Sequence, residues 1–208
     1  LIKAPLEEIT EREQLTSSGQ SNINTALRNV NALLRLTTNL INFERADTYS
    51  GSLYVSEYEL STYMEETIDA FRSYANIKHI NLTYESSFRY LNVWLDKDKM
   101  DSILKNIISN ALKYTPDGGN VHVFTSETED TWSIEVKDTG IGIPASEQKK
   151  LFKMHFRGSN AINSKVTGSG IGLLLVGKLV HLHKGKLNFS SMEGKGSCIK
   201  ITFPKGNK

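Results

Sequence analysis

Two glycine clusters constrain this chain more than any other feature. The first, Asp138-Thr-Gly-Ile-Gly142, ends an alternating stretch, and the second, Gly168-Ser-Gly-Ile-Gly-Leu173, runs into an apolar helical stretch. Glycine permits positive φ and lets a ligand approach the bare backbone closely. A glycine loop that opens a helix also presents free N–H groups and a partial positive charge, which favour phosphate. The sequence therefore predicts a nucleotide site built from two glycine loops.

The composition is typical of a folded globular protein. Hydrophobic residues make up 38% of the 208 residues and charged residues 23%, which argues against disorder. The 25 basic and 23 acidic residues leave a net charge of +2, too balanced to favour a nucleic-acid or membrane surface. The single cysteine, Cys198, excludes an intrachain disulfide and a cysteine cluster for zinc. No apolar run approaches the roughly 20 residues that a membrane helix needs, and no signal-peptide pattern appears, so we expect no membrane contact. Because the sequence begins at Leu1 with helical character, we expect it to be a piece of a longer protein.

Residues 1–46 have helical periodicity throughout. We expect a first helix over residues 1–15, kinked near Pro5, a turn over residues 16–20, and then a second helix. Apolar residues recur along the second helix in steps of four and three at Ile23, Leu27, Val30 and Leu34. Such a narrow seam predicts a second copy of the hairpin that completes a four-helix bundle. The alternative is that the hairpin packs on its own globular domain.

Strands and helices alternate in the rest of the chain, after a boundary expected over residues 45–52. The periodicity predicts helices over residues 60–74, 98–113, 144–151 and 171–183. Strands are expected over residues 53–55, 80–84, 93–95, 121–125, 132–138, 186–190 and 197–203. The last strands form hairpins, so we expect an α+β fold: a two-layer α/β sandwich with a mixed sheet and helices on one face.

Polar side chains lie along one face of the helix expected over residues 98–113. Asn106, Asn110 and Lys113 fall at i, i+4 and i+7, away from the apolar positions. Asparagine is a modest helix former, so two on one face require a reason. An amide oxygen is a hard neutral ligand that suits Mg²⁺, and a lysine adds positive charge for phosphate. The alternative is a solvated polar face with two ordinary asparagines.

Asp138 ends a stretch with the periodicity of a strand. Trp132, Ile134 and Val136 alternate with polar residues, so a period of two places Asp138 on the same inward face. A carboxylate that points inward needs a donor, and the amino group of adenine would serve. The alternative is that the strand has already ended and that Asp138 caps a turn into Gly140.

Short motifs of other families fit this chain less well. Asp138-Thr-Gly140 matches the triplet of aspartic proteases, but that hypothesis leaves both asparagines and the second glycine cluster unexplained. No glycine loop ends in the Gly-Lys-Ser/Thr of a P-loop. The second cluster follows a polar loop instead of a strand, so it is not a dinucleotide-binding fingerprint.

Four motifs together resemble those of sensor histidine kinases. Asn106-Ile-Ile-Ser-Asn-Ala-Leu-Lys-Tyr114 resembles their N box, Asp138–Gly142 their G1 box, Phe152–Arg157 their F box and Gly168–Leu173 their G2 box. The motifs stand in the order and spacing of that family. The resemblance implies the Bergerat-type ATP-binding fold, which is shared with the gyrase, mismatch-repair and heat-shock-chaperone ATPases.

The resemblance also implies a domain organisation. Residues 1–48 would be part of the dimerisation and histidine phosphotransfer hairpin, and residues 53–204 the catalytic ATP-binding kinase domain. Ile2-Lys-Ala-Pro-Leu6 is similar to the tail of the family's H box, and the short first helix is typical of hybrid sensors. We therefore expect a homodimer through residues 1–46, in the cytoplasmic portion of a membrane-anchored sensor.

Roles for individual residues follow from the same resemblance. Asn110 would hold a Mg²⁺ ion that bridges the phosphates of ATP, and Asp138 would accept from the amino group of adenine. Tyr114 would lie along the nucleotide, and the residues that leave room for the base would be Gly140 and Gly142. The phosphates would be contacted by Asn106, Lys113 and Arg157 and wrapped by Gly168, Ser169, Gly170, Gly172 and Leu173. The small, polar residues 158–167 fit a mobile lid or a plain surface loop.

Asn106 distinguishes this chain from the hydrolysing branch of the superfamily. In that branch a glutamate one turn before the metal-binding asparagine activates water, whereas an amide cannot take a proton. We therefore expect ATP to be held with little hydrolysis and its γ-phosphoryl group to go to a histidine. By resemblance, the next acceptor would be the aspartate of a response-regulator receiver domain.

The acceptor histidine is the point at which the chain departs from the family. The hairpin contains none of the five histidines, which are His79, His122, His155, His181 and His183. When the proline of the H box is aligned on Pro5, the histidine falls just before Leu1, so we expect ATP binding without self-phosphorylation. Two alternatives stay open: a hydrolysing ATPase of the same superfamily, and a non-catalytic dimeric adaptor with a vestigial nucleotide pocket.

Overall fold

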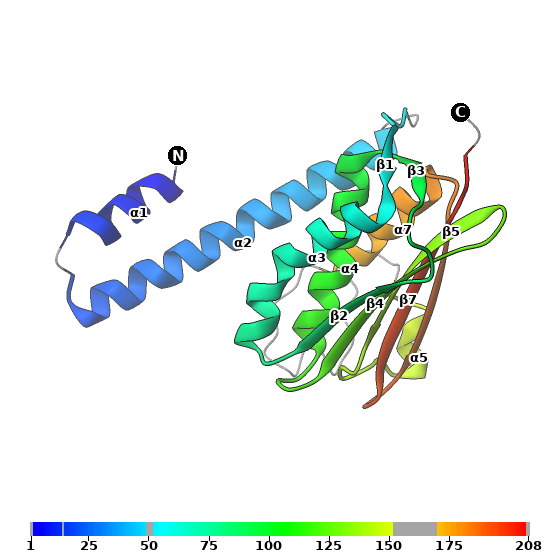
Figure 1. Cartoon of the computed structure of the whole chain (residues 1–208). Helices are drawn as coiled ribbons and strands as arrows, with labels where there is room; N and C mark the ends of the chain where they lie inside the picture. The colour runs from blue at the N-terminus through cyan, green and yellow to red at the C-terminus, as the bar shows by residue number, and fades with distance from the viewer. Residues whose placement is uncertain (1, 14, 49–51, 152–169, 207–208) are drawn as a thin grey trace. The chain divides into compact units, whose positions relative to one another are not determined.

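The structure, a computed structural model, describes residues 2–13, 15–48, 52–151 and 170–206 (Figure 1). The chain divides into two compact units, Leu1–Thr48 and Tyr49–Lys208. Among the described residues, no helix has both the length and the apolar character that crossing a bilayer requires.

The first unit is a helical hairpin made of α1 (Lys3–Arg12) and α2 (Ser17–Thr48). Pro5 lies in the first turn of α1, where its missing N–H leaves no helical hydrogen bond unmade. The turn expected over residues 16–20 is wrong from Ser17 onward, because Thr16 caps α2 instead. The Thr16 hydroxyl oxygen accepts from the Gly19 N–H at 3.1 Å, and its carbonyl accepts from the Gln20 N–H at 2.9 Å.

The apolar seam of α2 stays accessible within one copy of the hairpin. Ile23, Leu27 and Val30 are only half-buried, and Leu33 and Leu34 are 62% and 53% exposed. No side chain described in α1 or α2 is buried. A seam with this periodicity therefore still has apolar surface to cover.

The second unit alternates strands and helices. Its elements are β1 (Ser56–Glu59), α3 (Leu60–Ile77), β2 (Asn81–Ser86), β3 (Asn92–Leu95), α4 (Lys97–Tyr114), β4 (Asn120–Glu127), β5 (Thr131–Asp138), α5 (Ala145–Gln148), α7 (Gly172–Leu182), β6 (Lys186–Met192) and β7 (Gly196–Pro204). The strand expected over residues 53–55 is wrong: the Tyr54 N–H donates to Oδ2 of Asp96 at 3.0 Å, and pairing begins only at Ser56. The helix expected over residues 144–151 is limited to α5.

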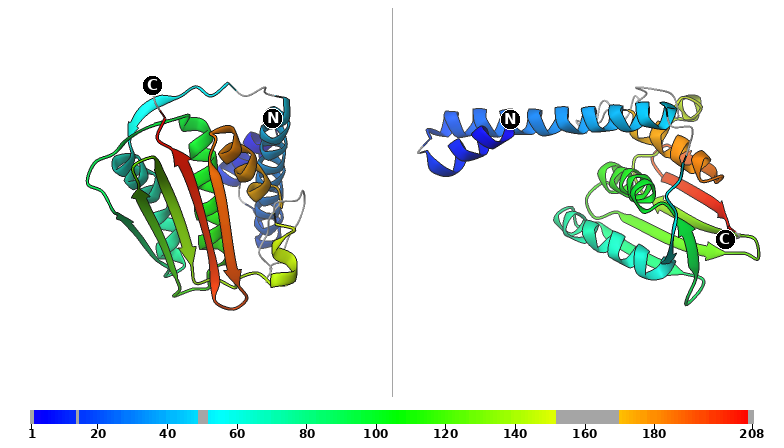
Figure 2. Two further views of the ribbon diagram at one scale, coloured as in Figure 1. Left: turned by 90° about the vertical axis from the view of Figure 1, so that its right-hand side faces the viewer. Right: turned by 90° about the horizontal axis from the view of Figure 1, so that it is seen from above.

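Five strands form one mixed sheet in the order β2-β4-β5-β7-β6. Only the β2–β4 pair is parallel, and the other three pairs are antiparallel. Strands β1 and β3 form a separate two-stranded ribbon. Helices α3, α4 and α7 all cover one face of the large sheet (Figures 1 and 2). This arrangement confirms the predicted α+β fold, a two-layer sandwich with helices on one face.

The core lies between the sheet and its helices. Buried residues alternate along β4, Trp132, Ile134 and Val136 of β5 are buried as predicted, and α4 buries one whole face. Fully buried side chains include Met64, Ile68, Ile103, Leu104, Ile107, Ile108, Leu112, Val121, Val123, Ile134, Val176 and Ile201. Because the helices and the sheet both contribute side chains to this core, packing of the apolar face of α4 on the sheet determines where its polar edge lies.

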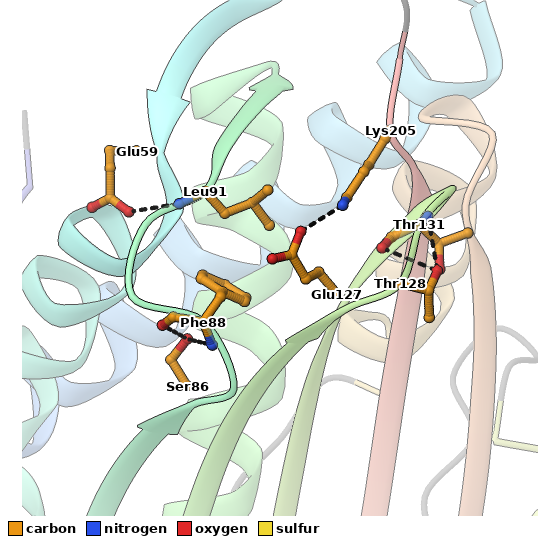
Figure 3. Close-up of polar contacts among 8 residues, drawn as sticks. All are labelled: Glu59, Ser86, Phe88, Leu91, Glu127, Thr128, Thr131 and Lys205. Carbon is orange, nitrogen blue, oxygen red and sulfur yellow. Dashed lines mark hydrogen bonds and ion pairs between the residues drawn. The ribbon is translucent and has the colours of Figure 1, made fainter.

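Polar contacts fasten the ends of several elements (Figure 3). The Glu59 carboxylate caps α3 by accepting from the Ser61 and Thr62 N–H groups, and it also accepts from the Leu91 N–H at 3.3 Å. Lys205 pairs with Glu127 at 2.5 Å where β4 ends. These contacts hold the start of α3 and the end of β4 in place.

Candidate nucleotide-binding site

Helix α4 carries the polar residues singled out in the sequence. It starts at Asp96, whose carboxylate accepts from the Lys99 N–H at 3.2 Å and so caps the first turn. The apolar face is buried, while Asn106, Asn110 and Lys113 are half-buried at its edge. These three side chains therefore share one accessible margin of the core.

Asn106 lies against the start of α7. Its Nδ2 donates to the Ser102 carbonyl at 2.8 Å, which folds the side chain back along α4. A Cβ on Gly172 would lie 2.5 Å from Asn106 Oδ1, closer than real Cβ atoms come. The glycine therefore allows α7 to approach α4 at this point, which brings Gly172 of the second glycine cluster next to Asn106.

Asn110 has a half-buried amide that is available to a ligand. No hydrogen bond to this side chain is formed by the residues that the structure describes. Because its amide is accessible and not engaged by the described residues, a ligand can take the place of water there. Its oxygen is a suitable ligand for Mg²⁺, so the chemistry of this position fits the metal.

Lys113 and Tyr114 form one group at the end of α4. The Lys113 ammonium lies 4.8 Å from the centre of the Tyr114 ring and 3.4 Å from its hydroxyl oxygen. The Tyr114 carbonyl accepts from the Ile141 N–H at 3.1 Å. The end of α4 is thus joined directly to the first glycine cluster.

Asp138 combines both alternatives that the sequence left open. Its Oδ1 accepts from the Gly140 N–H at 2.8 Å, which caps the turn, and from the Ser197 N–H at 3.2 Å. The residue also continues the inward alternation of β5, and it is half-buried. Burial raises the pKa of the Asp138 carboxyl, and the two backbone N–H groups oppose that rise. Within the described chain no further hydrogen bond reaches this carboxylate, so Oδ2 is left as an acceptor.

The two glycines of the first cluster pack against the protein itself. A Cβ on Gly140 would lie 2.6 Å from the Tyr114 carbonyl oxygen. Gly142 has φ +61°, and a Cβ there would collide with the Met192 carbonyl. Backbone on this side therefore requires glycine at both positions, and room for a base beside them stays a prediction. Contact with a nucleotide stays a prediction for both.

The turn between β6 and β7 supports the first glycine cluster, which the sequence did not indicate. Ser191 Oγ accepts from the Ile143 N–H at 2.9 Å, and the Gly194 N–H donates to the Ile141 carbonyl at 2.8 Å. Gln148 on α5 donates to the carbonyls of Ile143 and Ser191 at 3.0 and 2.8 Å. Ser191 lies 48 positions from Ile143 and 43 from Gln148, so no local pattern could have revealed its contacts.

The second glycine cluster is described only in part. Gly170 has φ +71°, and no side chain caps the start of α7 within the described residues. Leu173 is half-buried in the first turn of α7. Arg157, Gly168 and Ser169 lie outside the described residues, as do the rest of Phe152–Arg157 and the segment expected to be a lid.

A comparison with protein-family models identifies the family of the unit that contains α4, Asp138 and α7. Residues 95–207 match the family model described as histidine kinase-, DNA gyrase B-, and HSP90-like ATPase. The chain belongs to this family. It carries the histidine kinase-type ATPase domain of two-component sensors, an ATP-binding domain, which confirms the family identified from the four motifs.

Relatives in sequence are histidine kinases. Sensor histidine kinase WalK of Bacillus subtilis is 34% identical over 174 residues, which are 83% of this chain and 28% of WalK. Histidine kinase P4 of Formosa agariphila is 27% identical over 209 residues, 99% of this chain and 15% of that protein. The chain thus spans less than a third of the length of either relative.

Solved structures of the family share the fold. Full-length ShkA in complex with AMPPNP gives a TM-score of 0.82 at 20% identity, covering 99% of this chain and 44% of ShkA. Histidine kinase ThkA in complex with response regulator protein TrrA gives 0.70 at 19% identity, covering 99% of this chain and 57% of ThkA. At these identities the likeness shows the fold alone.

Proposed function

We propose that the second unit binds the adenine of ATP through Asp138 and is the catalytic domain, residues 53–204, of a cytoplasmic protein-histidine kinase. The Asp138 carboxylate carries this proposal. Two backbone N–H groups fix Oδ1, and Oδ2 has no donor among the described residues. A half-buried acceptor of this kind needs a donor, which the adenine amino group supplies.

Mg²⁺ fits the same site through Asn110, whose amide is half-buried and not engaged by described residues. When bound, the ion would neutralise charge on the phosphates. Lys113 adds a fixed positive charge at the end of α4, beside Tyr114. We propose that the nucleotide lies along Tyr114, Gly140 and Gly142. The residues that we propose contact the phosphates are Asn106, Arg157, Gly168, Ser169, Gly170, Gly172 and Leu173.

The proposed acceptor of the γ-phosphoryl group is a histidine other than the five in this chain. His183 is buried, His181 is exposed in the last turn of α7, and His79 is exposed just after α3. His122 lies within β4, and His155 lies outside the described residues. Asn106 cannot act as a base toward water, because an amide takes no proton and its Nδ2 already donates to Ser102. These features favour phosphoryl transfer over hydrolysis.

Two partners belong to the proposal. The structurally similar kinase ThkA forms a complex with response regulator protein TrrA, and we propose that the phosphoryl group passes here to a receiver aspartate. We also propose that residues 1–48 are a dimerisation and phosphotransfer hairpin that pairs with a second copy. The accessible seam at Ile23, Leu27 and Val30 supports this pairing.

Calorimetric titration of the chain with ATP analogues tests the proposal, with Mg²⁺ and with EDTA. We expect binding in both and tighter binding with Mg²⁺. Absence of nucleotide binding would point to the adaptor with a vestigial pocket. Steady release of inorganic phosphate from ATP would instead support the hydrolysing ATPase, and stable label from [γ-³²P]ATP would show that one of the five histidines accepts. Sedimentation of the chain and of residues 53–208 tests the dimer.

A further inference from the structure

The ammonium group of Lys78 sits at the C-terminal end of α4. Its Nζ donates to the carbonyls of Leu112 at 2.9 Å, Lys113 at 3.4 Å and Thr115 at 2.7 Å. An ammonium group has three N–H donors, so these carbonyls account for all of them. A positive charge at this end of a helix is also favourable because the carbonyl dipoles point toward it.

The remaining two carbonyls of the last turn accept hydrogen bonds from Thr115 and Ile141. The Ala111 carbonyl accepts from the Thr115 N–H at 3.1 Å and from its hydroxyl at 2.7 Å. The Tyr114 carbonyl accepts from the Ile141 N–H at 3.1 Å. A helix leaves its last four carbonyls without intrahelical partners, so Lys78 supplies two of the four that α4 needs.

Lys78 is itself fixed by its backbone. It directly follows α3, and its N–H donates to the Tyr74 carbonyl at 3.3 Å. Its own carbonyl accepts from the Gly118 N–H at 3.3 Å, in the turn that follows α4. The side chain is half-buried. The lysine is thus held on both sides before it reaches the helix end, which lowers the cost of ordering its long side chain.

We propose that Lys78 is a positioning residue for the nucleotide site. The inference rests on the proposed function, because Lys113 and Tyr114 belong to the turn that Lys78 caps. Without the ammonium group, two helix-end carbonyls lose their donor, and this turn frays. The Tyr114 carbonyl then no longer presents a fixed acceptor to the Ile141 N–H, and the loop that begins at Asp138 loosens with it.

Two substitutions in the full chain test the role of the ammonium group. Lys78→Met keeps an apolar stem and removes all three donors, and we expect Mg²⁺–ADP to bind about tenfold more weakly. Lys78→Arg keeps the charge and several N–H donors, and we expect its affinity within about threefold of wild type. In the nucleotide-free protein, hydrogen exchange of the Ile141 amide should accelerate in Lys78→Met and stay slow in Lys78→Arg.

Tyr63→Phe is the matched control. Tyr63 on α3 donates to Asp101 on α4 at 2.6 Å, so its loss removes another link between the same two helices, nearer the start of α4. We expect this variant to lower the melting temperature without changing ADP affinity or Ile141 exchange. A Lys78→Met protein that changes neither property, or changes them no more than Tyr63→Phe does, would overturn the inference.

The nucleotide-free measurement separates this inference from the proposed function. If the wild-type chain binds no ADP, the proposed function fails, and exchange of the Ile141 amide still decides whether Lys78 positions the loop. If Lys78→Met does not fold, Lys78→Gln, which keeps an uncharged amide donor, is compared in the same two measurements. Wild-type behaviour of Lys78→Gln in both would count against the role of the ammonium charge.

Discussion

The Ser197 N–H donates to Oδ1 of Asp138 over 3.2 Å, although the two residues are 59 positions apart in the chain. The Gly140 N–H reaches the same oxygen at 2.8 Å. Among the described residues, no side-chain cation pairs with this carboxylate, and burial raises its pKa above the usual aspartate range. The fold therefore keeps an acidic group in place at some cost in stability, as is common where a ligand is recognised.

Asp138→Asn should separate recognition from folding. We expect ADP affinity to fall by at least about tenfold, because an amide that accepts the two N–H groups through its oxygen turns an NH₂ group toward adenine. A raised native pKa means that the charged carboxylate costs stability as the pH rises above the unfolded pKa of about 3.9, and the full cost is present above the native pKa. The free energy of unfolding at pH 7 should therefore stay within about 1 kcal/mol of wild type or rise.

Calorimetry and denaturant unfolding measure the two effects of Asp138→Asn, with Asp117→Asn in an exposed turn as the matched control. Unchanged ADP affinity in Asp138→Asn would show that Asp138 does not bind the nucleotide. A loss of affinity equal to that of the control would do the same.

Asn110→Ala should abolish the metal-dependent part of nucleotide binding. We expect wild type to bind ADP about tenfold more tightly with Mg²⁺ than with EDTA, and the variant to bind equally weakly in both. Asn188→Ala, at an exposed position of β6, is the control and should keep the wild-type difference. A Mg²⁺ effect of wild-type size in Asn110→Ala would show that the ion is held elsewhere.

Gly172→Ala tests the close approach of α7 to α4. Alanine near a helix start should stabilise the helix by up to about 1 kcal/mol relative to glycine. We expect the opposite here, because the new Cβ would lie 2.5 Å from Asn106 Oδ1 and must displace that side chain. Thermal unfolding and ADP titration should both show a loss, whereas Gly206→Ala, with nothing within 4 Å, should show none. A more stable Gly172→Ala protein with full affinity would contradict the packing.

His183 should make stability depend on pH. Nδ1 lies 2.8 Å from the Leu179 carbonyl, so it carries the proton, and the buried Nε2 has no hydrogen-bond partner among the described residues. Burial lowers the pKa of His183, and Lys99 adds to this effect, while the Leu179 carbonyl and Asp96 oppose it. The native pKa therefore lies below the unfolded value of about 6.5.

A depressed histidine pKa stabilises the fold at pH values above the unfolded pKa, and this contribution is lost as the pH falls. We expect the free energy of unfolding to decrease as the pH falls below about 6.5. His183→Phe should remove the part of this pH dependence that His183 causes. Denaturant unfolding at several pH values measures it, and His181→Gln at an exposed position is the control. If His183→Phe shows the same pH dependence of the free energy of unfolding as wild type, His183 is not its cause.

Most of the fold could be predicted from local patterns. The alternation of Trp132, Ile134 and Val136 defines β5, and the apolar face of α4 follows the helical period. The strand expected over residues 53–55 fails because a tertiary contact competes with local propensity. Tyr54 gives its N–H to Asp96, 42 positions away, so an apolar stretch that looks like a strand pairs with no neighbour there.

The sequence by itself determined the family, the helix that carries Asn106, Asn110 and Lys113, and the strand that ends at Asp138. Periodicity reports which side chains share a face, because it depends only on neighbours along the chain. Only the tertiary structure decided that Ser197 fixes Asp138 and that Lys78 closes the end of α4. These hydrogen bonds join residues that are 59 and 34 positions apart. Nearly every residue carries a backbone donor and acceptor, so no local pattern distinguishes the backbone groups that form such a bond.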